Sequence, residues 1–209
     1  METNKNIRLQ FDHPLQVRAD EKTNERFIVG LASVYDKRSK LLSEEGKTFY
    51  EVIERGAFDG VLSEIESGNQ DVLLTINHDK EKLLARTKSK TLSLRSVENG
   101  LEYSAKLPNT TLGNDIWEQV QRGDLFESSL IFGTRRENIK WLRDPAEQYA
   151  TRKIAKIELL LDVSIVTNGA YANTDVQTAI RELVEFEEAI HSEDLESYNL
   201  KLKLYKKLT

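Results

Sequence analysis

The sequence predicts an α+β fold, built mainly as an antiparallel β-barrel with flanking helices and followed by a C-terminal helical extension. Short β-rich runs separated by turn signals follow one another from residue 7 to about residue 167. Two helical patterns interrupt these runs, and after Tyr171 the chain changes to helical periodicity. We therefore expect a β domain over residues 1–172 and a helical extension over residues 173–209.

The strands are predicted from short runs rich in β-branched and aromatic residues. The pair Asn99-Gly100 lies between two alternating apolar segments and predicts a hairpin, because both positions of such a turn favour positive φ. The predicted strands cover residues 26–35, 71–76, 91–97, 101–107, 125–134, 152–157 and 159–167.

Apolar residues at helical spacing predict two helices inside the β domain. The first covers residues 57–66 and ends before Gly68, and the second covers residues 111–122 and ends at Gly123.

The segment after residue 172 predicts two further helices. Asn173 or Thr174 is suited to cap the first, and Ser192 the second. The apolar seam from Leu195 to Tyr205 fits a coiled coil that would support self-association, or a helix folded back on the barrel.

Composition excludes several classes of function. The net charge of −5 argues against a nucleic-acid binder, and the absence of cysteine removes disulfides, thiol nucleophiles and thiolate metal sites. No apolar run approaches the roughly 20 residues of a membrane span, and the first residues lack an apolar signal core. The three histidines are scattered and the glycines form no nucleotide-binding loop. We expect a cytosolic protein without cofactor, metal or membrane contact.

A serine nucleophile is the chemistry that the remaining polar residues favour. Serine needs a neighbouring base, which is usually a histidine oriented by a third polar group. His78 lies in a turn between apolar runs, and histidine titrates near neutral pH. Ser128 and Ser129 lie on or at the start of an apolar strand, and Asp162 lies inside another. A carboxylate in an apolar strand is costly unless it is paired.

Each of these residues also has a structural explanation when it is taken alone. His78 fits a solvated turn, the serines fit a structural role in a strand, and Asp162 fits the solvent face of an amphipathic strand. Their spacing does not decide between the two explanations.

The order of several motifs adds a resemblance to a known family. The chain resembles the prohead (capsid maturation) proteases of HK97-type tailed bacteriophages, a serine peptidase family related to herpesvirus assemblin. The matching motifs, in chain order, are GLASVYD at 30–36, ERGAFD at 54–59, NHD at 77–79 with LART at 84–87 and TLSL at 91–94, GDL at 123–125 with SSLIF at 128–132, and DVSIVT at 162–167 with Ala170, Tyr171 and Thr174.

The resemblance implies an assemblin-like serine endopeptidase with His78 as general base and Ser129 as nucleophile. Ser129 is preferred over Ser128 because Phe132 then follows the nucleophile by three residues, as in the family. Asp162 is the residue expected to orient His78, with Glu158 and Asp79 as alternatives.

The resemblance also implies substrates and a place of action. The family cleaves the scaffolding segment of the major capsid protein, the internal scaffold and itself, inside the immature, portal-containing prohead in the host cytoplasm. The helices beyond residue 172 are a candidate for removal by self-cleavage.

Two departures from the family bear on function. Ile131 stands where the family usually has glycine, next to backbone that commonly shapes an oxyanion hole. Residues 167–171 read TNGAY instead of the usual Thr-x-Pro-Ala-Tyr, which concerns only a turn. Two alternative functions follow: a catalytically inactive protease-fold scaffold or assembly factor, and a small β-barrel binding module unrelated to phage assembly.

Overall fold

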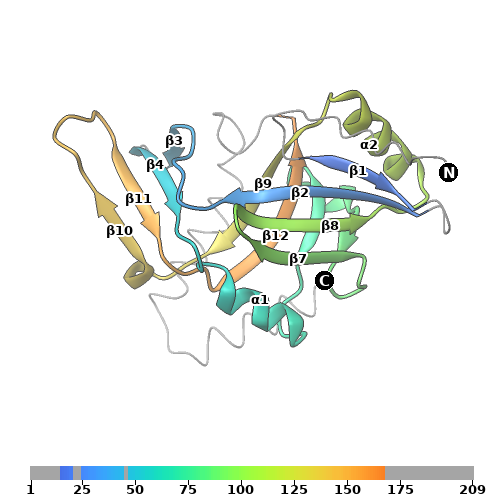
Figure 1. The fold of residues 1–209 in the computed structure, drawn as a ribbon, viewed down its shortest axis with the longest axis horizontal. Helices are drawn as coiled ribbons and strands as arrows, with labels where there is room; N and C mark the ends of the chain where they lie inside the picture. Colours follow the sequence, from blue (N-terminus) through green and yellow to red (C-terminus); the bar gives the residue numbers. More distant parts are fainter. Residues whose placement is uncertain (1–14, 21–24, 45–46, 168–209) are drawn as a thin grey trace, which may run out of the picture.

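Figure 1 shows the computed structural model of the chain, which describes residues 15–20, 25–44 and 47–167. β-Strands dominate these ranges and are accompanied by two α-helices and two short 3-10 helices, η1 (Lys80–Lys82) and η2 (Arg136–Asn138). The predicted helical extension over residues 173–209 lies outside the described residues.

The strands form three four-stranded sheets. The first sheet has the order β1 (Gln16–Ala19), β2 (Arg26–Val34), β8 (Gly100–Lys106) and β7 (Leu92–Val97). The second has the order β10 (Ile139–Leu142), β11 (Ala150–Ile154), β4 (Lys47–Ile53) and β3 (Leu42–Glu44). The third has the order β6 (Ala85–Arg86), β5 (Leu73–Ile76), β12 (Leu159–Val166) and β9 (Glu127–Gly133).

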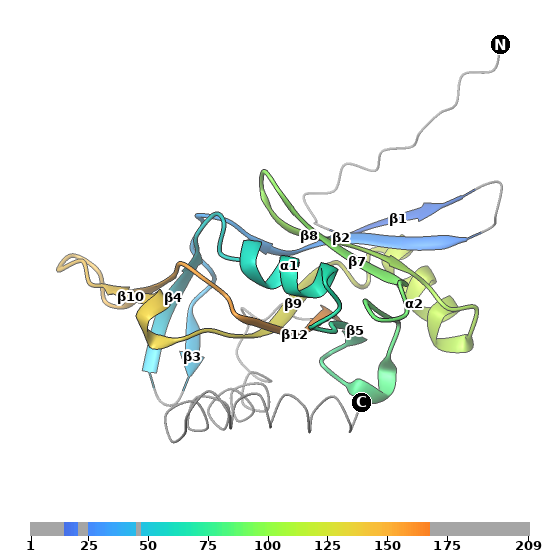
Figure 2. The same cartoon turned by 90° about the horizontal axis from the view of Figure 1, so that it is seen from below.

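The predicted antiparallel barrel is wrong on two counts. Among the described residues, none of the three sheets closes on itself, because the outer strands of each sheet are not hydrogen-bonded to one another. Two pairs are also parallel, β11 with β4 and β12 with β5. In Figures 1 and 2 the second sheet extends to one side of the other two.

The main core lies between the first and third sheets. It is built from buried apolar side chains of both sheets, including Leu101 and Tyr103 on β8 and Val163 and Ile165 on β12. The Tyr103 hydroxyl reaches β9, where it lies 2.9 Å from Ser128 Oγ. A Cβ at Gly30 on β2 would come within 2.7 Å of that hydroxyl, so glycine leaves room for the Tyr103 ring.

The predicted hairpin at Asn99-Gly100 is present, but for a different physical reason. β7 and β8 pair antiparallel with Val97 opposite Gly100, and neither Asn99 nor Gly100 has a positive φ. A Cβ on Gly100 would lie 1.9 Å from the carbonyl oxygen of Ser33. The close approach of β2 therefore requires glycine at this position.

The two α-helices lie where the sequence predicts them. α2 covers Thr111–Arg122, begins with the Thr110 hydroxyl accepting a hydrogen bond from the Gly113 N–H, and ends at Gly123 with φ 79°. α1 covers Asp59–Glu66, two residues shorter than the prediction at its start. α1 contacts β7 and α2 contacts β1, so the helices flank the first sheet at different places.

Candidate active site

His78 lies in a tight turn that directly follows β5. Asn77 and His78 both have left-handed backbone conformations, with φ of 51° and 57°. For histidine this conformation is uncommon and costs of order 1 kcal/mol, so its surroundings must hold it in place. The Asn77 N–H donates to the Ile165 carbonyl at 3.0 Å, and the His78 N–H donates to Ser164 Oγ at 2.8 Å. The turn is thus fixed to β12.

Asp162 contacts the imidazole of His78. Its Oδ2 lies 2.5 Å from His78 Nδ1, and its Oδ1 accepts a hydrogen bond from Thr75 Oγ1 at 2.8 Å. The register between β12 and β9 shifts between Leu160 and Asp162, which leaves Leu161 as an extra residue. Because side chains alternate along a strand, this bulge keeps both Leu160 and Val163 in the core and directs Asp162 to the opposite face.

Burial dominates the electrostatics of Asp162, whose residue is 5% exposed. Burial raises the pKa of Asp162 above its ordinary value, while the hydrogen bonds from His78 and Thr75 act in the opposite direction. An ionised carboxylate only accepts hydrogen bonds, so the proton between the two groups belongs to His78 Nδ1. His78 Nε2 then carries the lone pair that a general base needs.

Ser129 lies on the same sheet face as Asp162. It is paired across the β9–β12 ladder with Ser164, two residues from Asp162, and Ser164 is paired in turn with Thr75 on β5. Directly paired residues in neighbouring strands share a face. The three hydroxyl residues Thr75, Ser164 and Ser129 therefore form a row across β5, β12 and β9.

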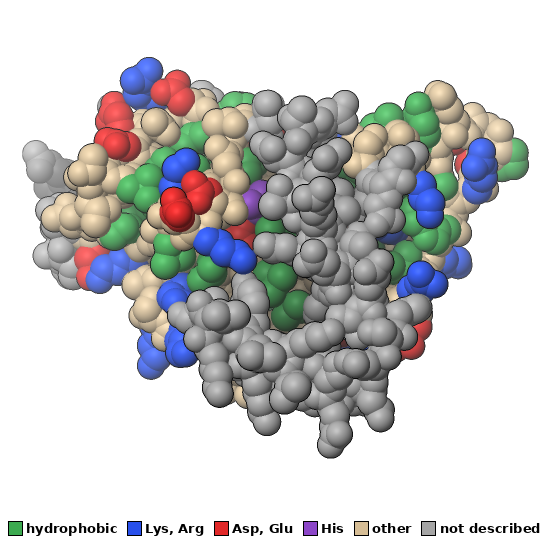
Figure 3. Space-filling view, turned by 180° about the vertical axis from the view of Figure 1, so that it is seen from behind, with side chains coloured by type: hydrophobic (Ala, Val, Ile, Leu, Met, Phe, Trp, Pro, Cys, Tyr) green, Lys and Arg blue, Asp and Glu red, His purple; other side chains and the backbone are tan. Residues whose placement is uncertain are grey.

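The hydroxyl of Ser129 is buried and has no hydrogen-bond partner among the described residues. A buried hydroxyl without a partner costs about 1–3 kcal/mol and calls for an explanation. Ser33 Oγ on β2 also lacks a partner among the described residues, so what distinguishes Ser129 is its position on the sheet face that carries Asp162. His78 is the one histidine among the described residues, and its side chain is 19% exposed. Figure 3 shows histidine colour (purple) at the surface of the face opposite to that of Figure 1.

Ser128, the neighbouring serine, points to the opposite face. Its hydroxyl lies 2.9 Å from that of Tyr103 in the first sheet. Consecutive residues of a strand alternate between the two faces, so only one of these serines shares a face with Asp162, and it is Ser129.

Comparison with protein families agrees with this chemistry. The model of a family described as caudovirus prohead serine protease matches residues 13–189 of the chain. The chain belongs to this family. It is therefore a serine peptidase of the phage prohead type. No curated protein matches the chain. Among solved structures, it is similar to the bacteriophage T4 capsid assembly protease, gp21, with 12% identity, a TM-score of 0.41, and coverage of 74% of this chain and 92% of that chain.

The two alternative orienting residues of the peptidase have other partners. Asp79 Oδ1 accepts from the Glu81 N–H at 3.0 Å, and its second oxygen lies 3.2 Å from Lys82 Nζ. Glu158 accepts from the Arg135 N–H and from the Asn138 amide, both at 3.0 Å. Asp162 is the carboxylate of the described residues that is bonded to His78.

Ile131, the departure next to the serine, occupies a regular strand position. It pairs with Asp162, has a negative φ and is 8% exposed. The backbone here does not require glycine. The Ile131 side chain lies on the face of Asp162 and Ser129, where it adds apolar surface beside the carboxylate.

Two residues of the site were not anticipated from the sequence, Thr75 and Ser164. Thr75 lies three residues before His78, and Ser164 is separated from Asp162 by one residue, which is the spacing that places two side chains on one strand face. That alternation was the available signal. For the described ranges, no group of three or more His, Asp or Glu side chains is arranged to hold a metal ion, and no helix is long and apolar enough to cross a membrane.

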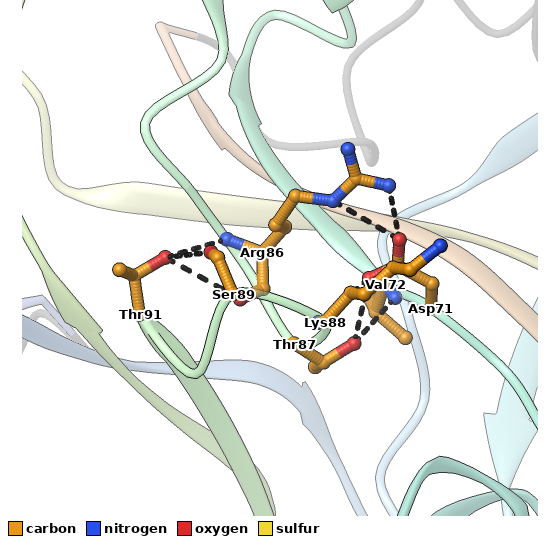
Figure 4. A network of polar contacts seen from close by, with 7 residues as sticks. All are labelled: Asp71, Val72, Arg86, Thr87, Lys88, Ser89 and Thr91. Atoms are coloured by element: carbon orange, nitrogen blue, oxygen red, sulfur yellow. Dashed lines mark hydrogen bonds and ion pairs between the residues drawn. The ribbon is translucent and has the colours of Figure 1, made fainter. Parts of the chain in front are cut away.

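A polar network joins the start of β5 to the end of β6, the two strands that flank the turn with His78 (Figure 4). Asp71, just before β5, accepts from Arg86 Nε at 3.0 Å and from the Lys88 N–H at 2.9 Å. Thr87 donates to Asp71 at 3.0 Å and accepts from the Val72 N–H at 2.8 Å. Burial works to raise the pKa of Asp71, but the hydrogen bonds from Arg86, Lys88 and Thr87 outweigh it, and the pKa is lowered.

We expect Asp71→Asn to lower the free energy of unfolding at pH 7 by about 1 kcal/mol, because the amide cannot accept all of these hydrogen bonds. Since the pKa of Asp71 is lowered by folding, its contribution is complete above about pH 4 and is lost as the pH falls through the lowered value. The difference between wild type and variant should therefore shrink in acid. Urea titrations at pH 7 and pH 3 measure it. A difference that grows in acid would contradict this account, and Asp144→Asn, at an exposed carboxyl that accepts from the Ala146 N–H, is the control.

Proposed function

We propose that Ser129, His78 and Asp162 form the catalytic machinery of this peptidase. The observation that carries the proposal is the 2.5 Å contact between His78 Nδ1 and Asp162 Oδ2 on the sheet face that holds the unpartnered Ser129 hydroxyl. The contact fixes the histidine tautomer, and the unpartnered hydroxyl is free to turn toward His78 Nε2. Catalytic hydrogen bonds often tighten only when substrate is bound.

The mechanism follows from these positions. Ser129 Oγ attacks the peptide carbonyl carbon while its proton moves to His78 Nε2, and the negative Asp162 stabilises the resulting imidazolium. His78 then gives the proton to the leaving amine as the C–N bond breaks, which leaves an acyl ester on Ser129. A water molecule, deprotonated by His78, attacks this ester, and the returning proton restores Ser129.

The proposed substrates are the scaffolding segment of the major capsid protein, the internal scaffold and the protease chain itself. This proposal rests on membership of the prohead protease family. Cleavage would take place inside the immature prohead in the host cytoplasm. Contact with the portal and self-association stay predictions from the sequence.

Co-expression with the major capsid protein of the same phage tests the substrate. We expect wild type to shorten the capsid protein on a gel and His78→Ala to leave it at full length, because His78→Ala removes the proposed base. Mass spectrometry of both proteins then gives the cleavage sites.

A capsid protein that stays intact beside folded wild-type protein would contradict the proposed substrate. It would favour the inactive assembly factor instead, provided that capsids assemble equally well with wild type and with His78→Ala.

A further inference from the structure

Four hydrogen bonds join His78, Ser164, Thr75 and Asp162 in a closed ring. The His78 N–H donates to Ser164 Oγ at 2.8 Å, and Ser164 Oγ donates to the Thr75 carbonyl at 3.1 Å. Thr75 Oγ1 donates to Asp162 Oδ1 at 2.8 Å, and Asp162 Oδ2 lies 2.5 Å from His78 Nδ1. The ring links the backbone of His78 to its own side chain through three other residues.

The direction of every hydrogen bond in this ring is determined by chemistry. A backbone N–H only donates, so Ser164 must accept from His78 and has its own proton left for Thr75. A carboxylate only accepts, so the Thr75 hydroxyl proton goes to Asp162. The Ser164 hydroxyl has a single proton, so its two 3.1 Å contacts, with the Thr75 carbonyl and with the Thr75 hydroxyl, share that proton.

The two hydroxyls control different degrees of freedom of the site. Ser164 accepts from the N–H of a partly buried residue held at φ 57°, so it stabilises the turn from which the imidazole projects. Thr75 holds one carboxylate oxygen of Asp162, which fixes the other oxygen toward the imidazole. Both residues are fully buried, at 0% exposure, and so do not present surface to a substrate.

From this ring we infer that Thr75 and Ser164 are positioning residues, which hold His78 and Asp162 in the geometry that activates Ser129. This inference rests on the proposed function of these three residues. Without the two hydroxyls, the partly buried His78 N–H and the buried Asp162 Oδ1 would each have one partner fewer, and the imidazole would lose its fixed orientation.

The charged surroundings of Asp162 make the role of Thr75 measurable as a pH effect. The groups that act on its carboxylate are His78, the Thr75 hydroxyl and the positive charge of Lys80, and all three lower its pKa against the effect of burial. Removing the Thr75 hydroxyl takes away one of the interactions that lower the pKa of Asp162, so burial raises this pKa further. The Asp162 carboxylate then takes up a proton at higher pH, and the acid limb of the rate profile moves upward.

The test uses the purified full-length chain and diisopropyl fluorophosphate as the probe. In this reaction Ser129 Oγ bonds to phosphorus, the P–F bond breaks, fluoride leaves and the hydroxyl proton passes to His78. We expect Thr75→Val, which keeps the shape but lacks the hydroxyl, to lower the limiting inactivation rate constant about 10- to 100-fold with an unchanged inhibitor constant. Thr75→Ser restores the hydroxyl and should recover most of the rate.

Ser164→Ala should lower the same rate constant while the adduct stays on Ser129. The control is Thr134→Val, which removes a buried threonine hydroxyl that donates to the Lys156 carbonyl away from the ring. Melting temperatures show that each variant is folded, and the control should lose stability without a change of rate.

Two outcomes separate the inference from the function on which it rests. If wild type forms no adduct on Ser129, the proposed catalytic machinery is wrong. If wild type reacts at Ser129 but Thr75→Val and Ser164→Ala react at the wild-type rate with the same acid limb, the catalytic machinery stands and the positioning role is overturned. Equal loss of rate in Thr75→Val and Thr75→Ser would also overturn it, because the hydroxyl would then not be the cause.

Discussion

Ser129→Ala is expected to lower the rate of peptide cleavage by about 10⁶-fold while the protein stays folded. The alanine lacks the only atom that can form the acyl ester, and substrate binding alone supplies the small residual rate. Because the Ser129 hydroxyl is buried without a partner, its removal should not lower the free energy of unfolding, and a small increase is expected. Cleavage of capsid protein and urea titration measure the two effects.

Ser128→Ala is the matched control, because it makes the same change one residue earlier in the chain. Its hydroxyl contacts Tyr103 on the opposite sheet face, so the variant should lose stability and keep its cleavage rate. The opposite result, with Ser128→Ala inactive and Ser129→Ala active, would place the nucleophile on the other face of β9 and refute the proposed site.

Asp162→Asn is expected to lower kcat/KM by about 10⁴-fold. The amide nitrogen would donate to His78 Nδ1, which places the imidazole proton on Nε2. A protonated Nε2 cannot accept the proton of Ser129. Asp79→Asn changes the other nearby carboxyl and keeps its capping hydrogen bond to the Glu81 N–H, so its rate should stay within about twofold of wild type.

Asp162→Asn is also expected to change how the stability of the protein depends on pH. Burial raises the pKa of Asp162, so the folded state favours the protonated carboxyl, and the contribution of this group falls as the pH rises from about 4 through the raised value. Asparagine is neutral and lacks this decline. Asp162→Asn should therefore gain stability relative to wild type between acid and neutral pH. A variant that is inactive because it is unfolded would instead show no cooperative urea transition at either pH.

The sequence predicts the individual elements of this fold better than their arrangement. The boundaries of α2 agree with the prediction, because Thr110 and Gly123 are strong end signals. The short strand β10 was not predicted, since most of its residues are exposed and show no alternation. The closed barrel was wrong because alternation indicates that a strand has two faces and does not indicate which strands are neighbours or whether a sheet closes.

The candidate site could be predicted only in part, because the sequence indicates which single residues need a partner but not which strands bring them together. A carboxylate in an apolar strand identified Asp162 as a residue that needs a partner, and the structure supplies His78. The bulge at Leu161, which directs Asp162 away from the core, has no sequence signal. The roles of Thr75 and Ser164 depend on the parallel pairing of β5 with β12, which the prediction did not contain.

The most direct test of the account is the position of the diisopropyl fluorophosphate adduct on the wild-type chain. Trypsin, which cleaves after Lys and Arg, releases residues 123–135 as one peptide with Ser128 and Ser129, and it places Ser164 in a different peptide. Fragmentation of the first peptide separates the two serines. We expect a single adduct on Ser129 that is absent from Ser129→Ala and strongly reduced in His78→Ala. An adduct on Ser128 or Ser164, or no adduct on folded protein, would contradict it.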